Sequence, residues 1–135
     1  MAQYVATDHS FTFNSVDLSA KMTKLTIEYS ANALADTAMG DTNESVAGGL
    51  KKWSIDAEFI QDHTGSSVDA TLFPLVGSTA AFIVKPTSSA VSATNPQFTG
   101  TALLVDYKVF DNEVGDLAKV VAHFENAGAL TRATT

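Results

Sequence analysis

The stretch GGLKKWSIDAEFIQD, residues 48–62, decides the fold. From Trp53 onward apolar and polar side chains alternate, and the apolar set is Trp53, Ile55, Ala57 and Phe59. Successive side chains of a β-strand point to opposite faces, so the pattern predicts a half-buried strand with an acidic outer face. We expect the other strands to pack on the face of Trp53, which makes Trp53, Ile55 and Phe59 core residues.

Five further segments show the periodicity or the apolar content of strands. They are residues 11–16, 22–31, 79–85 and the pair 97–111 and 117–126, which a short polar turn joins as a hairpin. The run at 79–85 is almost continuously apolar, which predicts a strand that is covered on both faces. In residues 97–111 the alternation places Leu103, Val105 and Tyr107 on one face and Leu104 and Asp106 on the other.

One short helix is expected after residue 66. Ser66 or Ser67 is placed to cap its N-terminus, and Leu72 and Phe73 belong to an apolar stripe that would join the core. Pro74 predicts a kink or an end of the helix, because proline removes a helical hydrogen bond and clashes with the preceding turn.

These elements together predict a mainly β protein: an antiparallel β-sandwich or barrel with one flanking short α-helix. The 135 residues fit a single domain, 1–135, with an N-terminal arm at 1–10, a long inter-strand loop at 32–49 and a C-terminal tail at 127–135. No cysteine is present, so disulfides and thiolate chemistry are excluded.

The charge of the chain narrows the classes of function. Its net charge is -7, with 15 acidic and 8 basic residues, which argues against a protein that clamps nucleic acid through phosphate contacts. No apolar run approaches the ~20 residues that span a bilayer, and the N-terminus lacks the pattern of a secretion signal. We therefore expect no membrane partner.

The loop at 32–49 has two interpretations. A loop of roughly 18 residues is uncommon inside a compact domain, and it is usually functional or disordered. It is either a mobile surface loop or a segment that docks onto another subunit, in which case the contact residues are Leu34, Met39, Asp41 and Val46.

The search for catalytic chemistry finds little. His9, His63 and His123 lack the short spacing of a metal motif, and no serine occupies a G-x-S-x-G elbow. Asp56 and Glu58 share one strand face and could form a carboxylate pair, but a solvated acidic face is the better explanation of them. We expect no enzyme, no metal and no cofactor.

Six short segments resemble the tail tube, or major tail, proteins of long-tailed bacteriophages. They occur in the same order as in that family and cover most of the chain from about Leu25: TAMGDT at 37–42, GLKKWS at 49–54, VDATLFPL at 68–75, VSATNP at 91–96, TGTALL at 99–104 and GALTR at 128–132. The first twenty residues match less clearly.

The resemblance implies a β-sandwich with a flanking helix that assembles into hexameric rings, which stack into a hollow tube. The expected partners are other copies of the chain, other tail proteins and genomic DNA, which passes through the lumen without specific binding. The expected location is the virion tail, after assembly in the host cytoplasm. By this analogy the loop at 32–49 reaches the next ring.

The charge fits this role independently, since carboxylates that line a conduit repel phosphates. The candidates for an acidic lumen face are Glu28, Asp56, Glu58, Asp106 and Glu125, and lysines on comparable faces complicate the assignment. Two alternatives stay open. One is another virion or contractile-injection protein, such as a tube or terminator β-domain, and the other is a small acidic β-sandwich that binds a carbohydrate or protein.

Overall fold

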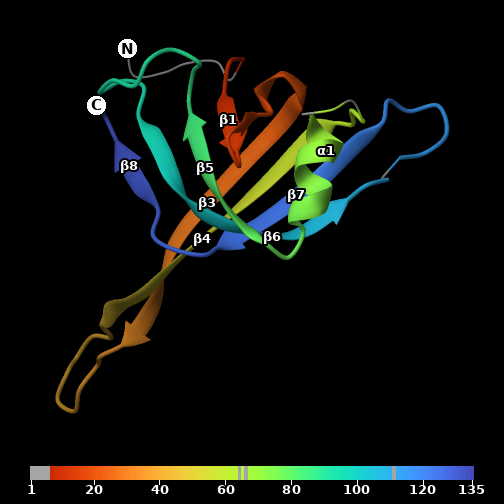
Figure 1. Ribbon diagram of the computed structural model, residues 1–135. Helices are drawn as coiled ribbons and strands as arrows, with labels where there is room; N and C mark the ends of the chain where they lie inside the picture. The colour runs from red at the N-terminus through yellow and green to blue at the C-terminus, as the bar shows by residue number, and fades with distance from the viewer. Residues whose placement is uncertain (1–6, 64, 66, 111) are drawn as a thin grey trace.

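The computed structural model describes residues 7–63, 65, 67–110 and 112–135. The chain is mainly antiparallel β, as the sequence predicts, with one short helix (Figure 1). The elements are β1 Ser10–Phe13, β2 Val16–Asp17, η1 Ser19–Lys21, β3 Met22–Ala35, β4 Val46–Ile60, α1 Val68–Leu72, η2 Phe73–Leu75, β5 Thr79–Lys85, β6 Gln97–Lys108, β7 Lys119–Asn126 and β8 Thr131–Ala133. No helix in the described part of the chain is long and apolar enough to span a bilayer.

The strands form one strongly curled sheet in the order β2-β1-β5-β6-β7-β4-β3, and β8 pairs with β6 outside this path. The sheet folds over so that its inner face encloses the core, and α1 lies against one side (Figure 1). All of the strand pairs are antiparallel.

Aromatic side chains fill the core between the two halves of the curled sheet. The Phe13 and Phe124 ring centroids lie 4.8 Å apart, and those of Trp53 and Phe82 lie 5.2 Å apart. Trp53 Nε1 donates a hydrogen bond of 2.9 Å to the carbonyl oxygen of Gly128, so burial of the indole leaves its polar atom satisfied. Each fully buried phenylalanine stabilises the fold by roughly 1.5–3 kcal/mol.

The helix is shorter than the apolar stripe predicts, and one predicted core residue is wrong. Val68, Thr71 and Leu72 are buried on one face of α1, whereas Phe73 is 65% exposed. The helix passes at Phe73 into the 3-10 turn η2, with Pro74 near its start. Residues three and four apart share a helix face, so burying Val68 and Leu72 leaves Phe73 pointing away from the core.

The predicted faces of β6 are correct up to Val105 and wrong beyond it, and a β-bulge explains the error. Ala102 and Leu104 are buried on the inner face, while Leu103 is on the outer face. The register with β7 shifts between Leu104 and Asp106, so Tyr107, three residues after Leu104, returns to the inner face. The extra residue of a bulge reverses the alternation, which strict period-two reasoning does not anticipate.

Two other predictions change in detail. In β5, Phe82 and Val84 are buried but Ala81 and Ile83 are exposed, so this strand is covered on one face only. The predicted C-terminal tail at 127–135 contains β8, which pairs with the start of β6. The first part of the predicted N-terminal arm, residues 1–6, lies outside the described residues.

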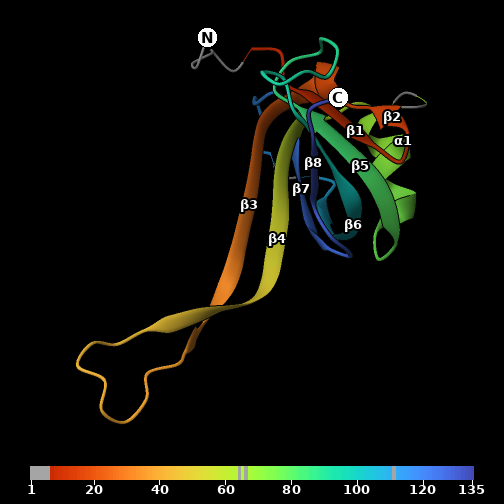
Figure 2. The same cartoon turned by 90° about the vertical axis from the view of Figure 1, so that its left-hand side faces the viewer.

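The predicted loop at 32–49 is too long at both ends. β3 runs on to Ala35 and β4 begins at Val46, so only the ten residues 36–45 connect the strands. Figure 2 shows the two strands leaving the body of the protein together as a long hairpin. We call residues 30–52 the projecting hairpin.

Candidate functional site

The projecting hairpin is a two-stranded ribbon without a third strand beside it. β4 pairs with β7 only from Ser54 to Ile60, whereas its pairing with β3 continues outward to Ala35 and Val46. An isolated two-stranded hairpin is marginally stable in water and is usually supported by a third strand or by a packed face. This segment therefore extends beyond the part of the fold that supports it.

The tip of the hairpin is ordered by its own hydrogen bonds. The Thr37 hydroxyl accepts a 2.9 Å bond from the Ser45 amide, and the Asp36 carboxylate accepts one from the Ser45 hydroxyl. Asp41 Oδ2 accepts a 2.6 Å bond from the Ala38 amide, and the intervening turn includes Gly40 at φ +98°. Asp41 thus has a role in shaping the turn.

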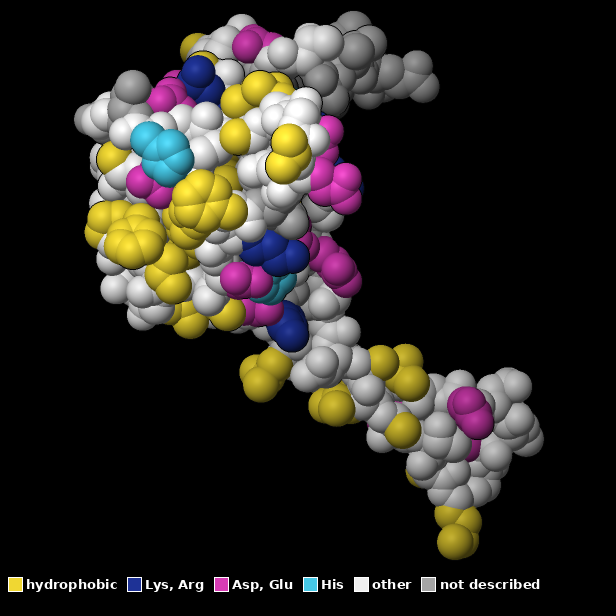
Figure 3. All heavy atoms as spheres, turned by 90° about the vertical axis from the view of Figure 1, so that its right-hand side faces the viewer, with side chains coloured by type: hydrophobic (Ala, Val, Ile, Leu, Met, Phe, Trp, Pro, Cys, Tyr) yellow, Lys and Arg dark blue, Asp and Glu magenta, His cyan; other side chains and the backbone are white. Residues whose placement is uncertain are grey.

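Apolar side chains are exposed along the projecting hairpin. The exposed fraction is 104% for Met39, 65% for Val46 and 55% for Leu34, and no other described part of the chain covers them. The cost of leaving apolar area in water is about 25 cal/mol per Å², so such a group is typical of a surface that a partner buries. Figure 3 shows hydrophobic side chains spaced along the hairpin and at its tip.

The open edges in the described part of the sheet include those of β3 and of the end of β6. β3 is the last strand of the sheet and spans 14 residues, and in the described structure β4 is its only strand neighbour. On β6, pairing with β5 ends at Leu103 while pairing with β7 continues to Lys108. An open edge presents unpaired backbone groups to another chain, which makes these edges candidate sites of lateral assembly.

The five candidate acidic residues lie on one face of the sheet. Cross-strand registers place Glu28 beside Ser54 and Ser54 beside Glu125, and in the next row Asp56 lies beside His123 and His123 beside Asp106. Glu58 follows in a third row. This face is opposite the core, because the neighbouring residues on each strand are the buried ones. We call it the outer sheet face.

His123 occupies the centre of the outer sheet face. Its Nδ1 lies 2.5 Å from Asp56 Oδ1 and its Nε2 lies 2.8 Å from Glu125 Oε1. Carboxylates only accept hydrogen bonds, so both contacts are satisfied when both ring nitrogens carry protons. The hydrogen bonds that His123 donates to Asp56 and then to Glu125 raise the pKa of His123, against a smaller effect of burial.

Lysines share the same face, which is therefore of mixed charge. In the strand register Lys24 lies opposite Glu58 and Lys108 lies opposite Val121, and Lys52 and Lys119 lie at two ends of the face. Since His123 gains a proton more readily than an ordinary histidine, it offsets part of the acidic charge near its centre. Carboxylates and cations are thus interspersed on this face.

A second apolar patch lies near α1. It consists of Phe73, Val76, Phe110, Val114 and Leu117, all of which are exposed. Figure 3 shows apolar side chains gathered on this side of the body, away from the hairpin. We call these five residues the lateral patch.

The residues around α1 serve to fasten it. The Tyr107 hydroxyl donates a 2.9 Å hydrogen bond to Asp69 Oδ1 and accepts one of 3.1 Å from Gln61 Nε2. Burial raises the pKa of Tyr107 to about 12, so the phenol stays protonated and keeps donating at neutral pH. This network joins α1 to β6 and β4.

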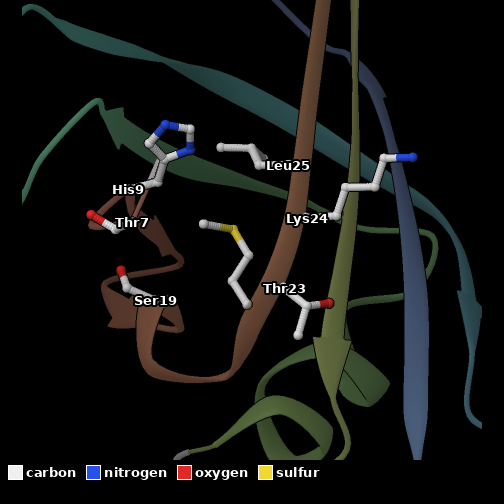
Figure 4. A pocket seen from close by; sticks show the side chains of 7 residues that line it. Thr7, His9, Ser19, Thr23, Lys24 and Leu25 are labelled. Atoms are coloured by element: carbon white, nitrogen blue, oxygen red, sulfur yellow. The ribbon is translucent and has the colours of Figure 1, made fainter. Parts of the chain in front are cut away.

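A pocket lies between residues 7–9, η1 and the start of β3 (Figure 4). His9 and Leu25 point toward one another across it, and Lys24 points away on the other side of β3. The Ser19 hydroxyl donates to Asp17 and accepts from the Phe11 amide at 2.8 Å, so it is committed to the turn. Among the described residues, no cluster of three or more His, Asp or Glu could hold a metal ion.

Comparison with known proteins gives no match by sequence. No family model matches the chain, and no curated protein matches it.

Solved structures show the same fold at low sequence identity. A chain of the virion of a native gene transfer agent particle is 14% identical, with a TM-score of 0.79 over 97% of this chain and 99% of that one. The SPP1 tail tube is 11% identical, with a TM-score of 0.73 over 95% of this chain and 77% of that one. The tail of an empty gene transfer agent particle with C6 symmetry is 15% identical, with a TM-score of 0.65 over 82% and 81%. The chain therefore has the fold of tail tube proteins.

The structure brings together two predicted sets of residues and adds one residue that was missed. The five acids share a face, and Leu34, Met39, Asp41 and Val46 share the projecting hairpin. His123 was assigned no role from sequence. Its spacing of two from Glu125 places both on one strand face, but its contact with Asp56 depends on the β4–β7 register.

Proposed function

We propose that the chain is a structural, non-enzymatic subunit of a tail tube, in which hexameric rings stack into a hollow conduit for DNA. The projecting hairpin is the observation that carries the proposal. A monomer gains nothing from extending a ribbon with exposed Leu34, Met39 and Val46 into water, whereas a stacked assembly buries them. The fold similarity to tail tube structures, which spans nearly the whole chain, supports the same role.

Lateral contacts within a ring need a second surface. The open edge of β3, the free second half of β6 and the lateral patch are available for it. Head-to-tail pairing of one patch with a different patch closes into a ring when the rotation between subunits divides the circle. A tail particle with C6 symmetry that shares the fold supports six subunits per ring.

The outer sheet face is our candidate for the lining of the conduit. Its carboxylates repel phosphates, and lysines interspersed among them offset this repulsion in part. The net charge of -7 on each subunit keeps the tube as a whole unfavourable for DNA binding. DNA then passes through without specific contacts, and other tail proteins join the ends of the tube.

The first experiment is negative-stain electron microscopy of the purified protein, with light scattering across a concentration series. We expect rings and stacked tubes with a central channel, and scattering that rises steeply above a critical concentration. A strictly monomeric protein at high concentration, with or without purified fragments of assembled tubes as seeds, contradicts the proposal. It favours instead the small binding module.

A tube from a contractile or secretion system has the same subunit shape. The two kinds of tube differ in their partners, because a contractile system surrounds the tube with a sheath. Isolating the assembled particle and identifying the proteins that copurify separates these cases. A sheath protein in stoichiometric amount favours the contractile alternative.

A further inference from the structure

We propose that the tip of the projecting hairpin of one copy docks into a groove at the opposite end of a second copy, where Arg132 pairs with Glu44. The proposal rests on the tube function above and names the partner surface of the hairpin. The groove lies between the connection 86–96 and the start of β8, and its lining includes Pro86, Phe98 and Arg132. We call it the end groove.

The end groove is built before any partner arrives. Asn95 is buried, and its side-chain amide nitrogen donates hydrogen bonds of 2.9 Å to the Ser89 carbonyl and 3.2 Å to the Ala90 carbonyl. Its Oδ1 accepts a 3.1 Å bond from the Thr87 amide. This one side chain therefore holds the loop in shape. A preformed site lowers the ordering cost of association.

The position of the end groove suits a stacked assembly. In Figures 1 and 2 the hairpin leaves one end of the body, and β8 with the connection between β5 and β6 lies at the other end. Copies repeated along the direction of the hairpin thus bring the tip of one toward the groove of the next. Such a contact joins two different surfaces and propagates into a filament.

The charges of the two surfaces are complementary. Residues 31–50 of the projecting hairpin contain Asp36, Asp41 and Glu44 and no lysine or arginine, and its two lysines, Lys51 and Lys52, lie at its base, away from the tip. The end groove carries Arg132, the only arginine of the chain, and Lys85 lies beside it with Nζ 3.1 Å from the Ser89 carbonyl oxygen. Asp8, an acidic residue nearby, is held by Ser88 at 2.8 Å.

Glu44 at the tip and Arg132 in the end groove are charged side chains that have no partner among the described residues. Asp36 and Asp41 accept hydrogen bonds within the tip, whereas Glu44 makes no ion pair or side-chain hydrogen bond with any described residue. The same is true of the Arg132 guanidinium within the described chain. The apolar part of the groove, at Pro86 and Phe98, suits the flexible side chain of Met39.

A charge swap tests the pairing. The critical concentration for tube formation is measured by sedimentation for wild type, Glu44→Arg, Arg132→Glu and the double variant. Each single variant should raise it by about fivefold or more, the effect expected from losing an exposed ion pair and adding repulsion. The double variant should return toward wild type. Circular dichroism melting should be unchanged in all four, since both side chains are exposed.

A matched control keeps the net charge of the double variant. Lys119→Glu combined with Glu44→Arg places the new acid on β7, outside the end groove, and should not restore assembly. Two outcomes overturn the pairing and leave the tube function standing. In the first, the wild type forms tubes and the single variants assemble as well as it does. In the second, the charge swap assembles no better than this control. Failure of the wild type to assemble contradicts the tube function itself.

Discussion

Trp53 shows how one residue ties distant parts of the chain together. Its ring packs on Phe82 from β5, and its Nε1 bonds the Gly128 carbonyl in the segment that leads to β8. Ile55, Phe59 and Leu72 are buried in the same core. Phe73 has the same side chain as the buried phenylalanines, yet it is exposed, because its position on the helix points it away from the core.

His123 is the titratable residue with the clearest consequence for pH. Its pKa is raised by hydrogen bonds to Asp56 and Glu125, and the unperturbed value is about 6.5. A group whose folded pKa is raised adds stability that is complete below the unfolded pKa and is lost as pH rises through the folded pKa. The imidazolium therefore favours the folded state on the acidic side of this window.

We expect the stability of the wild type to fall more than that of His123→Gln as the pH rises upward from about 6.5. Urea unfolding at several pH values gives the free energy of unfolding of each protein. The difference between the two values cancels all contributions that the proteins have in common. A titration of the His123 ring by NMR should give a pKa above about 6.5. A ring that titrates at or below that value contradicts the arrangement with Asp56 and Glu125.

Among the secondary elements, the projecting hairpin is the one that the fold does not need. Its strands extend past the last rung that β7 supports, at Ser54, and its tip contacts no other described part of the body. Removing it deletes little buried apolar surface. The stability of the body should then depend on the remaining β3–β4 rungs from Met22 to Ser30.

Replacement of residues 32–50 by Asn-Gly closes the hairpin with a two-residue turn between the paired residues Ala31 and Lys51. We expect the free energy of unfolding to change by no more than about 1 kcal/mol. Tube formation should be lost. Urea unfolding and electron microscopy measure the two effects.

A less drastic variant, Met39→Ser with Val46→Ser, keeps the hairpin and should also prevent tubes. The control is Asn43→Ser, a polar change at the same tip, which should assemble like wild type. Long tubes from either the truncated or the double serine variant show that Met39 and Val46 do not join the rings.

At the scale of the whole molecule, the two faces of the sheet separate folding from function. The inner face holds the aromatic core, and the outer sheet face carries Glu28, Asp56, Glu58, Asp106 and Glu125 together with lysines and His123. Substitutions on the outer face should therefore alter what passes over it without unfolding the protein. The fold should tolerate these substitutions because the charged side chains of the outer sheet face do not reach the core.

Charge reversal on the outer sheet face tests its place in the conduit. In Asp56→Lys with Glu58→Lys we expect tubes to assemble and to retain short duplex DNA in sedimentation at low salt, with release at high salt. DNA ejection from particles built with this variant should be slower. The control reverses Glu113 and Asp116, exposed acids of the connection between β6 and β7. If the outer-face variant and the control variant retain equal amounts of DNA, the outer sheet face does not line the lumen.

The sequence by itself determined the fold class and most strands. Period-two alternation reports which side chains share a face, and it was sufficient for residues 54–60 of β4 and for β7, because no bulge interrupts the pairing between them. It also identified the acids of the outer sheet face and the apolar residues of the hairpin. These inferences need only local periodicity and composition.

Only the tertiary structure decided the rest, because it depends on pairing between distant segments. The bulge before Asp106 reverses the face of β6, and the β4–β7 register brings Asp56 to His123. Residues 32–35 and 46–49 carry little strand periodicity, and cross-strand hydrogen bonds make them a ribbon. Phe73 is exposed because burial of Val68 and Leu72 sets the helix phase. Backbone pairing and helix orientation are set by the whole chain, and a local pattern carries no record of them.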